Sequence, residues 1–145
     1  MDLVAQIAAA KEPAEALRRI VSAFGADTGT LHLVEPDGLL HLKARSGEFP
    51  LPVLAAIREI PIGKGMAGLA VERAQPVDAC NIQTDTSGDV RPGARATGMA
   101  GAIVVPVFAG ARVIGALGIA NRGERSFTEE EKSALIAAGR ALAAL

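Results

Sequence analysis

The polar side chains best suited to binding a ligand lie in one irregular stretch between Cys80 and Gly98. Two arginines in such a short loop can clamp a carboxylate or a phosphate, because a planar guanidinium donates parallel hydrogen bonds. The alternative is that Asp85 and Asp89 pair with these arginines and only hold the loop in place. Long loops in compact domains are usually functional or mobile. The candidate ligand-binding residues are Thr84, Asp85, Asp89, Arg91, Arg95 and Thr97.

Catalytic, metal and cofactor chemistry finds little support in the sequence. Cys80 is the single cysteine, which excludes a disulfide or a cysteine zinc site and predicts a small buried packing residue. His32 and His41 are expected to face each other across a hairpin, but no third metal ligand accompanies them. We also find no Ser-His-Asp order and no carboxylate pair of the kind that catalysis uses. The expectation is a protein that is not an enzyme and that needs no metal or cofactor.

A literal GxGxxG pattern occurs at Gly63, Gly65 and Gly68. A dinucleotide site needs a buried parallel strand before this pattern and a βαβ repeat around it. Here Pro61 interrupts the preceding strand, and the helix expected over Met66–Arg73 is not followed by a second parallel strand. We therefore predict that the glycines form a tight turn, which starts a short helix lying across a sheet.

The composition is that of one globular domain spanning residues 1–145. The net charge is −1, no basic run occurs, and only 3% of the residues are aromatic, so a nucleic-acid partner is not expected. The sequence has no signal-like N-terminus and no apolar run of membrane-spanning length, so we expect a cytoplasmic protein without a membrane partner.

The most apolar part of the chain is a hairpin with strands over Ala102–Phe108 and Arg112–Ala120. Its residues are largely β-branched or small, and Gly110 lies at the turn. Because both faces of the strands are apolar, we expect the hairpin to be central in a sheet and covered on both sides. Pro106 has no N–H to donate, which predicts a bulge or an unpaired position there.

A second hairpin is predicted over Thr28–Val34 and Leu39–Ala44, with residues 35–38 as a four-residue turn. This register places Leu33 opposite Leu40, and it places Leu31 opposite Leu42. The remaining elements follow from apolar spacing and from helix start and stop signals. They are helices over residues 2–10, 13–24, 50–59, 66–73 and 129–145, and a short strand over residues 76–79.

The C-terminal helix begins with a predicted capping box, in which Thr128 is the N-cap and Glu131 lies three residues later. Its apolar residues have near-heptad spacing, and the N-terminal helix adds a second stripe around Leu3 and Ile7. We therefore expect a homodimer formed through a bundle of the terminal helices. The residues of the C-terminal stripe are Leu135, Ala138, Leu142 and Leu145.

Three motifs together make the chain resemble the GAF domain family of small-molecule-sensing modules. They are IGKGMAG at residues 62–68, the run from Thr97-Gly-Met to VVPV at residues 104–107, and RVIGALGI at residues 112–119 followed by SFTEEE at residues 126–131. The resemblance implies an α+β fold with an antiparallel β-sheet. The N- and C-terminal helices would cover one face, and short helices plus a long loop would cover a ligand pocket on the other. A PAS-like fold is the alternative, but it does not predict the capped C-terminal helix beside helix 13–24.

Cyclic-nucleotide-binding members of the family carry an Asn-Lys…Phe-x-x-x-Asp-Glu signature after the central hairpin. This chain resembles it through Asn121, Arg122, Phe127 and Glu131, although Glu and Lys stand where Asp and Glu belong. The resemblance implies a structural ion pair between Arg122 and Glu131. Bilin-binding members attach the pigment to a cysteine that is commonly followed by histidine, and members that reduce free methionine sulfoxide cycle through several cysteines. The single Cys80, followed by asparagine, fits neither group.

The resemblance implies a non-catalytic sensing or regulatory module in signal transduction. It would bind a small-molecule ligand, anionic if the loop arginines hold it, and would pass its state to a signalling protein partner. One alternative is a dimerisation or interaction module that has lost ligand binding. A more distant alternative is an enzyme resembling free methionine sulfoxide reductases, which the single cysteine disfavours.

Overall fold

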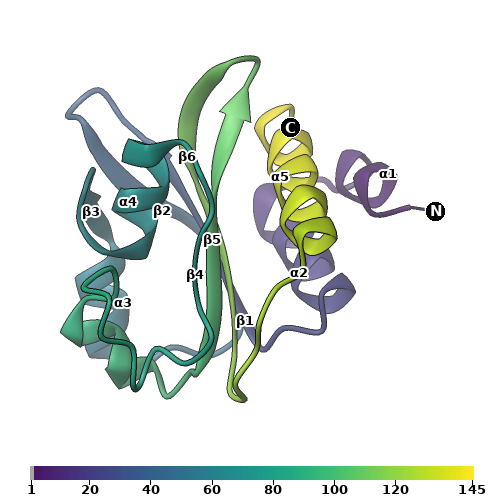
Figure 1. Ribbon diagram of the computed structural model, residues 1–145. Coiled ribbons are helices and arrows are strands. Elements are labelled where there is room, and N and C mark those ends of the chain that lie inside the picture. The colour runs from purple at the N-terminus through teal and green to yellow at the C-terminus, as the bar shows by residue number, and fades with distance from the viewer. Residues whose placement is uncertain (1) are drawn as a thin grey trace.

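The computed structural model describes residues 2–145, and its centre is a six-stranded sheet in the order β3-β2-β1-β6-β5-β4 (Figure 1). Every neighbouring pair of strands is antiparallel, which confirms the predicted α+β fold. The apolar hairpin β5–β6 lies inside the sheet, and β6 pairs with β1 at its middle. The strands are β1 (Thr28–Val34), β2 (Leu39–Ser46), β3 (Glu59–Pro61), β4 (Val77–Ala79), β5 (Gly101–Ala109) and β6 (Arg112–Asn121).

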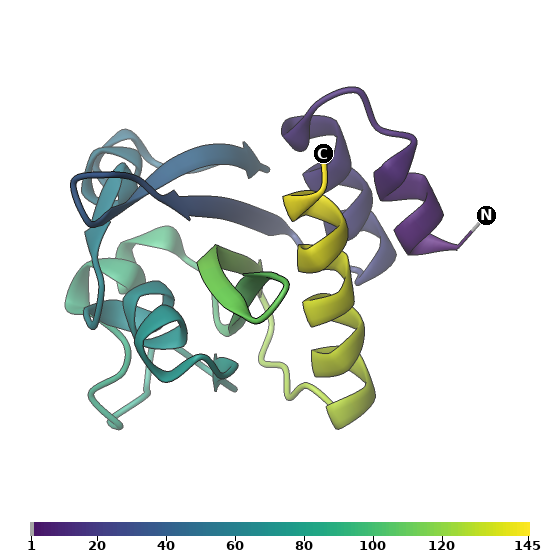
Figure 2. The ribbon, with the colours of Figure 1, turned by 90° about the horizontal axis from the view of Figure 1, so that it is seen from above.

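The helices cover the two faces of the sheet as predicted (Figures 1 and 2). The terminal helices α1 (Leu3–Ala8), α2 (Pro13–Ala23) and α5 (Glu129–Ala143) lie on one face. The short helices α3 (Leu51–Ile57) and α4 (Gly65–Arg73) lie on the other, together with a 3-10 helix, η1 (Pro92–Thr97), inside the long loop. The fold therefore has three layers, with the sheet in the middle.

The main core lies between the sheet and the terminal helices. Leu17 and Ile20 of α2 and Leu135 of α5 pack against Val105 and Leu117 of the central strands. The start of α5 carries the predicted capping box, with Thr128 and Glu131 exchanging hydrogen bonds. This layer makes the sheet a rigid floor for whatever the opposite face holds.

The hairpin β1–β2 has a different register from the predicted one. Glu35 N–H donates to the Leu39 carbonyl at 3.0 Å, and Gly38 has φ +82°, so the loop has three residues instead of four. Leu33 consequently lies opposite His41, and a bulge after Leu31 places that residue opposite Ala44. The predicted pairs with Leu40 and Leu42 are therefore wrong.

The two histidines do not face each other, contrary to prediction. His32 pairs with Leu42 and lies on the face covered by α3 and α4, whereas His41 pairs with Leu33, which packs into the helix-side core. Directly opposed residues share a face of the sheet, so the two imidazoles point to opposite sides. Cys80 was also predicted wrongly, because it is exposed and not buried.

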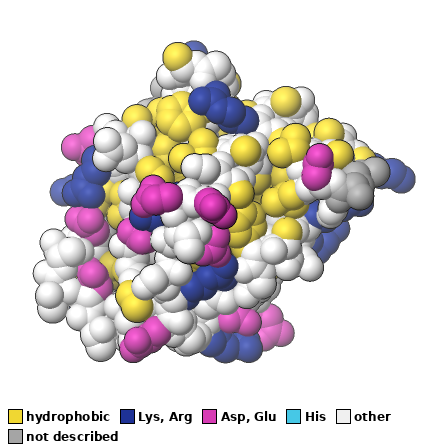
Figure 3. Space-filling view, turned by 45° about the vertical axis from the view of Figure 1, so that its right-hand side comes forward, with side chains coloured by type: hydrophobic (Ala, Val, Ile, Leu, Met, Phe, Trp, Pro, Cys, Tyr) yellow, Lys and Arg dark blue, Asp and Glu magenta, His cyan; other side chains and the backbone are white. Residues whose placement is uncertain are grey.

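The apolar stripe on α5 is largely used inside this chain. Leu135, Ala138 and Leu142 are buried against the sheet, whereas Leu145 is 47% exposed and Val4 of α1 is 48% exposed. Figure 3 shows apolar side chains between charged ones on the side that brings these helices forward. The homodimer through the terminal helices stays a prediction.

No helix within residues 2–145 combines the length and the apolar character that crossing a membrane requires.

Candidate functional site

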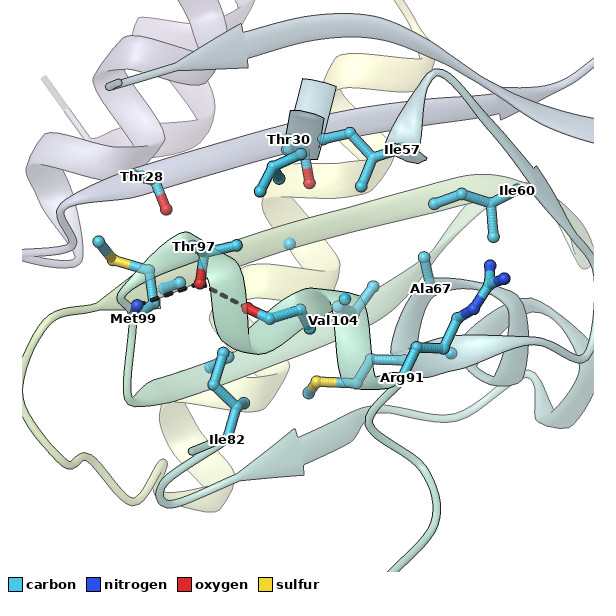
Figure 4. Close-up of a pocket in the computed structure, with 18 of the residues that line it drawn as sticks. Thr28, Thr30, Ile57, Ile60, Ala67, Ile82, Arg91, Thr97, Met99 and Val104 are labelled. Carbon is cyan, nitrogen blue, oxygen red and sulfur yellow. Dashed lines mark hydrogen bonds between the residues drawn. The ribbon is translucent and has the colours of Figure 1, made fainter. Parts of the chain in front are cut away.

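A cavity of about 210 Å³ lies on the face of the sheet opposite the terminal helices. Its floor is formed by β1, β6 and β5, and its cover by α3, the start of α4, Arg91 and η1 (Figure 4). Most of the side chains around it are apolar, among them Ile57, Ile60 and Val104. A concave, mostly apolar site with a few polar groups is the usual form of a small-molecule pocket.

Strand β1 supplies three polar side chains to the cavity, from Thr28, Thr30 and His32. Alternate residues of a strand point to the same face, so their spacing of two brings all three to this side. Thr28 is 5% exposed, and within residues 2–145 neither threonine hydroxyl has a hydrogen-bond partner. Figure 4 shows the Thr28 hydroxyl directed from the strand into the cavity. No side-chain N or O atom of residues 2–145 is buried without a hydrogen-bond partner, so the Thr28 hydroxyl oxygen keeps accessible surface, where a polar group of a ligand could bond to it.

His32 connects the sheet to the helix that covers the cavity. Its Nε2 lies 2.8 Å from the Ile57 carbonyl oxygen, which requires Nε2 to carry the proton and donate. The side chain is only 2% exposed, and this burial lowers the pKa of His32 below its ordinary value of 6.5, against the smaller opposing effect of the Ile57 carbonyl. We infer that the neutral imidazole holds the end of α3 in place.

The pH dependence of stability tests this role of His32. Because its pKa is lower in the folded protein than in the unfolded chain, the unfolded chain binds the proton first as pH falls. The wild-type protein should therefore lose melting temperature between about pH 7 and about pH 5, and His32→Gln should lose less over the same range. His41→Gln, which removes the other histidine, is the control. A flattened pH profile in the His41 variant alone would contradict the assignment.

The glycine pattern forms the turn that starts α4, as predicted. Gly63 has φ +89° and donates its N–H to the Gly68 carbonyl at 2.9 Å, which closes the turn over the first residues of the helix. Lys64 is the N-cap, and its side chain accepts no hydrogen bond from the helix. The first N–H groups of α4, at the positive end of the helix dipole, therefore have no side-chain cap. Gly65, Met66 and Ala67 line the cavity, so this end of the helix faces it.

Of the six predicted loop residues, Arg91 and Thr97 line the cavity and the other four do not. Thr97 is held within η1, because its hydroxyl donates to the Ala94 carbonyl at 2.8 Å and accepts from the Met99 N–H at 3.0 Å. Thr84 is exposed and lies outside the cavity lining. The structure thus brings only Arg91 and Thr97 of the predicted set to the cavity.

Asp85, Asp89 and Arg95 hold the loop down, but not through the predicted Asp–Arg pairs. Asp89 pairs with Arg73 of α4, at 3.0 and 3.2 Å to its two carboxylate oxygens. The Arg95 guanidinium donates to the backbone carbonyl of Asp85 at 3.1 Å, and the Asp85 carboxylate accepts from Ser87. Arg91 is left without a carboxylate partner among residues 2–145. The predicted alternative of local pairing is therefore wrong for the one arginine that lines the cavity.

The motif residues at the end of β6 and after it form a network of polar contacts outside the cavity. Glu131 pairs with Arg125 at 2.7 Å, not with Arg122, so the predicted ion pair is wrong. Arg122 contributes only its backbone N–H, which donates to the Asp27 carboxylate at 2.8 Å. Asn121 donates to the Gly25 carbonyl at 2.8 Å, and Phe127 is buried beneath the Arg125 guanidinium. This network joins the end of α2 to the start of α5.

Sequence reasoning missed the polar side chains of β1. The signal was present as the alternation TGTLHL, in which Thr28, Thr30 and His32 recur at every second position. An alternation of this kind usually marks a solvated face. Here the same face lies beneath α3 and α4, so its polar groups line a cavity.

Comparisons with known proteins agree with this architecture. The GAF domain of a phosphoenolpyruvate-protein phosphotransferase from Coxiella burnetii superposes with a TM-score of 0.78 at 22% identity, over 98% of this chain and 86% of that one. The corresponding Acinetobacter domain gives 0.77 at 20% identity, with the same coverage. A free methionine-R-sulfoxide reductase from Neisseria meningitidis, solved with its substrate, gives 0.77 at 22% identity, over 97% of this chain and 81% of that one.

These identities establish the fold alone, since one fold serves both a phosphotransferase GAF domain and a free methionine-R-sulfoxide reductase. No curated protein matches the chain in sequence. The family model described as GAF domain matches residues 12–145, which is nearly the whole chain. With the sheet, the two helical layers and the cavity in the expected places, the match shows that the chain belongs to the GAF domain family.

Proposed function

We propose that this chain is a non-catalytic small-molecule-sensing module, which binds a metabolite in the cavity and passes its state to a signalling protein partner. The observation that carries the proposal is the cavity itself. In the part of the chain that the structure describes, the threonine hydroxyls on its floor have no hydrogen-bond partner, and the arginine at its rim has no carboxylate partner. The phosphotransferase GAF domains that share the fold support a signalling context.

The size of the cavity limits the ligand. At about 210 Å³ it holds the volume of about seven water molecules, and it lies below the range of about 300–1,000 Å³ that is typical of pockets for drug-sized ligands. A cyclic nucleotide or a bilin is larger than this volume and would have to extend beyond the cavity. We therefore propose a ligand the size of an amino acid or a short organic acid.

The position of the thiol supports a binding role over the reductase alternative. Cys80 is the only cysteine, it is exposed, and it does not line the cavity. A thiol outside the pocket cannot attack a sulfoxide bound inside it, and a single cysteine cannot form an intramolecular disulfide.

The proposal is tested by a thermal-shift screen of amino acids, 2-oxo acids and nucleotides, followed by calorimetry of any compound that stabilises the protein. Ala67→Phe fills the cavity from α4 and should abolish the shift. Ala137→Phe makes the same change on the exposed side of α5 and should keep it. Absence of any shift across the panel, or a shift that survives Ala67→Phe, would contradict pocket binding. Sulfoxide turnover that is lost in Cys80→Ser would establish the enzyme alternative instead.

A further inference from the structure

We infer that the cavity selects a small organic carboxylate with an apolar body and a second hydrogen-bonding group at its far end. Its carboxylate would lie against Arg91 and the start of α4, and its far group would bond to Thr28 and Thr30. The inference rests on the proposed function and adds the chemistry of the ligand to it.

Arg91 and Lys64 lie at the first end of the cavity, and neither forms an ion pair within residues 2–145, although the Glu72 carboxylate lies beside Gly63 at the same turn. The Cγ and Cδ atoms of Arg91 lie 3.0 and 2.8 Å from the position that a Cβ on Gly65 would occupy, so this side chain packs on the first residue of α4. Lys64, the N-cap of α4, also lines the cavity and has no carboxylate partner. Two cations beside a helix N-terminus repel both the helix dipole and each other, and a bound anion would remove that repulsion.

The nearest loop carboxylate is already engaged elsewhere. Asp89 lies two residues before Arg91, but both of its oxygens accept from Arg73 at 3.0 and 3.2 Å. The arrangement therefore keeps Arg91 available while it anchors the loop that carries it.

The second end of the cavity offers hydrogen bonds without charge. Thr28 is more than nine-tenths buried, its hydroxyl has no hydrogen-bond partner among residues 2–145, and it points into the cavity (Figure 4). Thr30 adds a second unpartnered hydroxyl on the same face of β1. Figure 4 places Thr28 beside Met99 at one end of the cavity and Arg91 beside Ala67 and Ile60 at the other. A ligand that satisfies both ends must be anionic at one end, apolar in the middle and polar at the other.

The inference is tested with three matched series of straight-chain compounds of about four to eight carbons, a size chosen for the cavity volume of about 210 Å³. These are ω-hydroxy carboxylates, alkanoates that lack the hydroxyl, and α,ω-diols that lack the carboxylate. Calorimetry or NMR titration should show that the ω-hydroxy carboxylate of best length binds most tightly. The diol of the same length should bind about tenfold to a hundredfold more weakly, and the alkanoate about threefold to tenfold more weakly.

Variants assign each preference to its residues. Arg91→Gln should remove the advantage of the hydroxy carboxylate over the diol, whereas Arg122→Gln, at an exposed arginine outside the cavity, should keep it. Thr28→Val combined with Thr30→Val preserves side-chain shape and should remove the advantage over the alkanoate. If compounds bind in a manner blocked by Ala67→Phe but ignore the charge at Arg91, the inference is wrong while the proposed function stands. If no compound of any class binds, the inference is wrong, and the thermal-shift screen with Ala67→Phe decides the proposed function.

Discussion

Replacing Gly68 with alanine is expected to lower the free energy of unfolding by about 3 kcal/mol, the upper part of the range for an overpacked site. A Cβ at this position of α4 would overlap the Pro61 carbonyl oxygen and lie 3.0 Å from the Gly63 backbone nitrogen. Both are backbone atoms of the turn that starts the helix, so neither can move aside as a flexible side chain would. Urea denaturation measures the loss directly.

The same substitution at Gly139 serves as the matched control. Gly139 lies in the middle of α5, and a Cβ there would meet Val107 and Leu117 side-chain atoms at 3.6 and 3.8 Å, which is ordinary contact. Alanine is a better helix former than glycine, so Gly139→Ala should raise stability by about 0.5–1 kcal/mol. A destabilised Gly139→Ala, or a Gly68→Ala with wild-type stability, would contradict the packing of these helices.

The Gly68 prediction also bears on the site. Gly68 packs against the turn that starts α4, and Gly65 and Met66, the first residues of this helix, line the cavity. If Gly68→Ala remains folded, it should therefore weaken binding of any anionic ligand as well as stability. Gly139→Ala should leave binding unchanged.

The elements that the sequence predicted well are those with a local cause. Apolar spacing identified α2 and α5, and the capping box at Thr128 marked the start of α5 within the residue. The glycine turn before α4 was equally predictable, because positive φ at Gly63 and Gly65 depends on the chain around them. Local propensity and tertiary packing agree at these positions.

The features that could not be predicted depend on contacts distant in sequence. Asp89 pairs with Arg73, sixteen residues earlier, and not with Arg91, two residues later. The packing of α4 against the loop determines which arginine it meets. The β1–β2 register depends on whether Gly38 ends a three- or a four-residue loop, and one residue of difference moves His41 to the other face. The cavity is formed by β1, α3 and η1, whose residues come from three distant parts of the sequence.

The network of polar contacts after β6 also depends on residues distant in sequence, and Arg125 is its centre. The Arg125 guanidinium donates to the Phe24 carbonyl at 2.7 Å, to the Asn121 side chain at 2.9 Å and to Glu131 at 2.7 Å. It also lies 4.6 Å from the centre of the Phe127 ring. Arg125→Ala should lower the free energy of unfolding by about 2–3 kcal/mol, since hydrogen bonds to charged, partly buried groups are strong.

Arg122→Ala is the control that separates the observed pair from the one that the family signature implies. Its side chain is exposed and outside this network, so its loss should change the free energy of unfolding by about 0.5 kcal/mol or less. If Arg122→Ala proves the more damaging of the two, Glu131 pairs with Arg122 in solution, and the arrangement described for this loop is wrong.

Glu131→Gln then isolates the charge on the other side of the pair. Glutamine can still accept from the Thr128 N–H, so the capping box survives while the ion pair is lost. The Thr128 N–H first, and Arg125 after it, lower the pKa of Glu131 below 4.5, so its contribution is complete above that pH and is lost as the pH falls through the lowered value. Wild-type stability should therefore decline in acid more steeply than that of Glu131→Gln. In the Arg125→Ala background the difference between the two profiles should narrow but persist, because the Thr128 N–H, the larger cause of the lowered pKa, is still present.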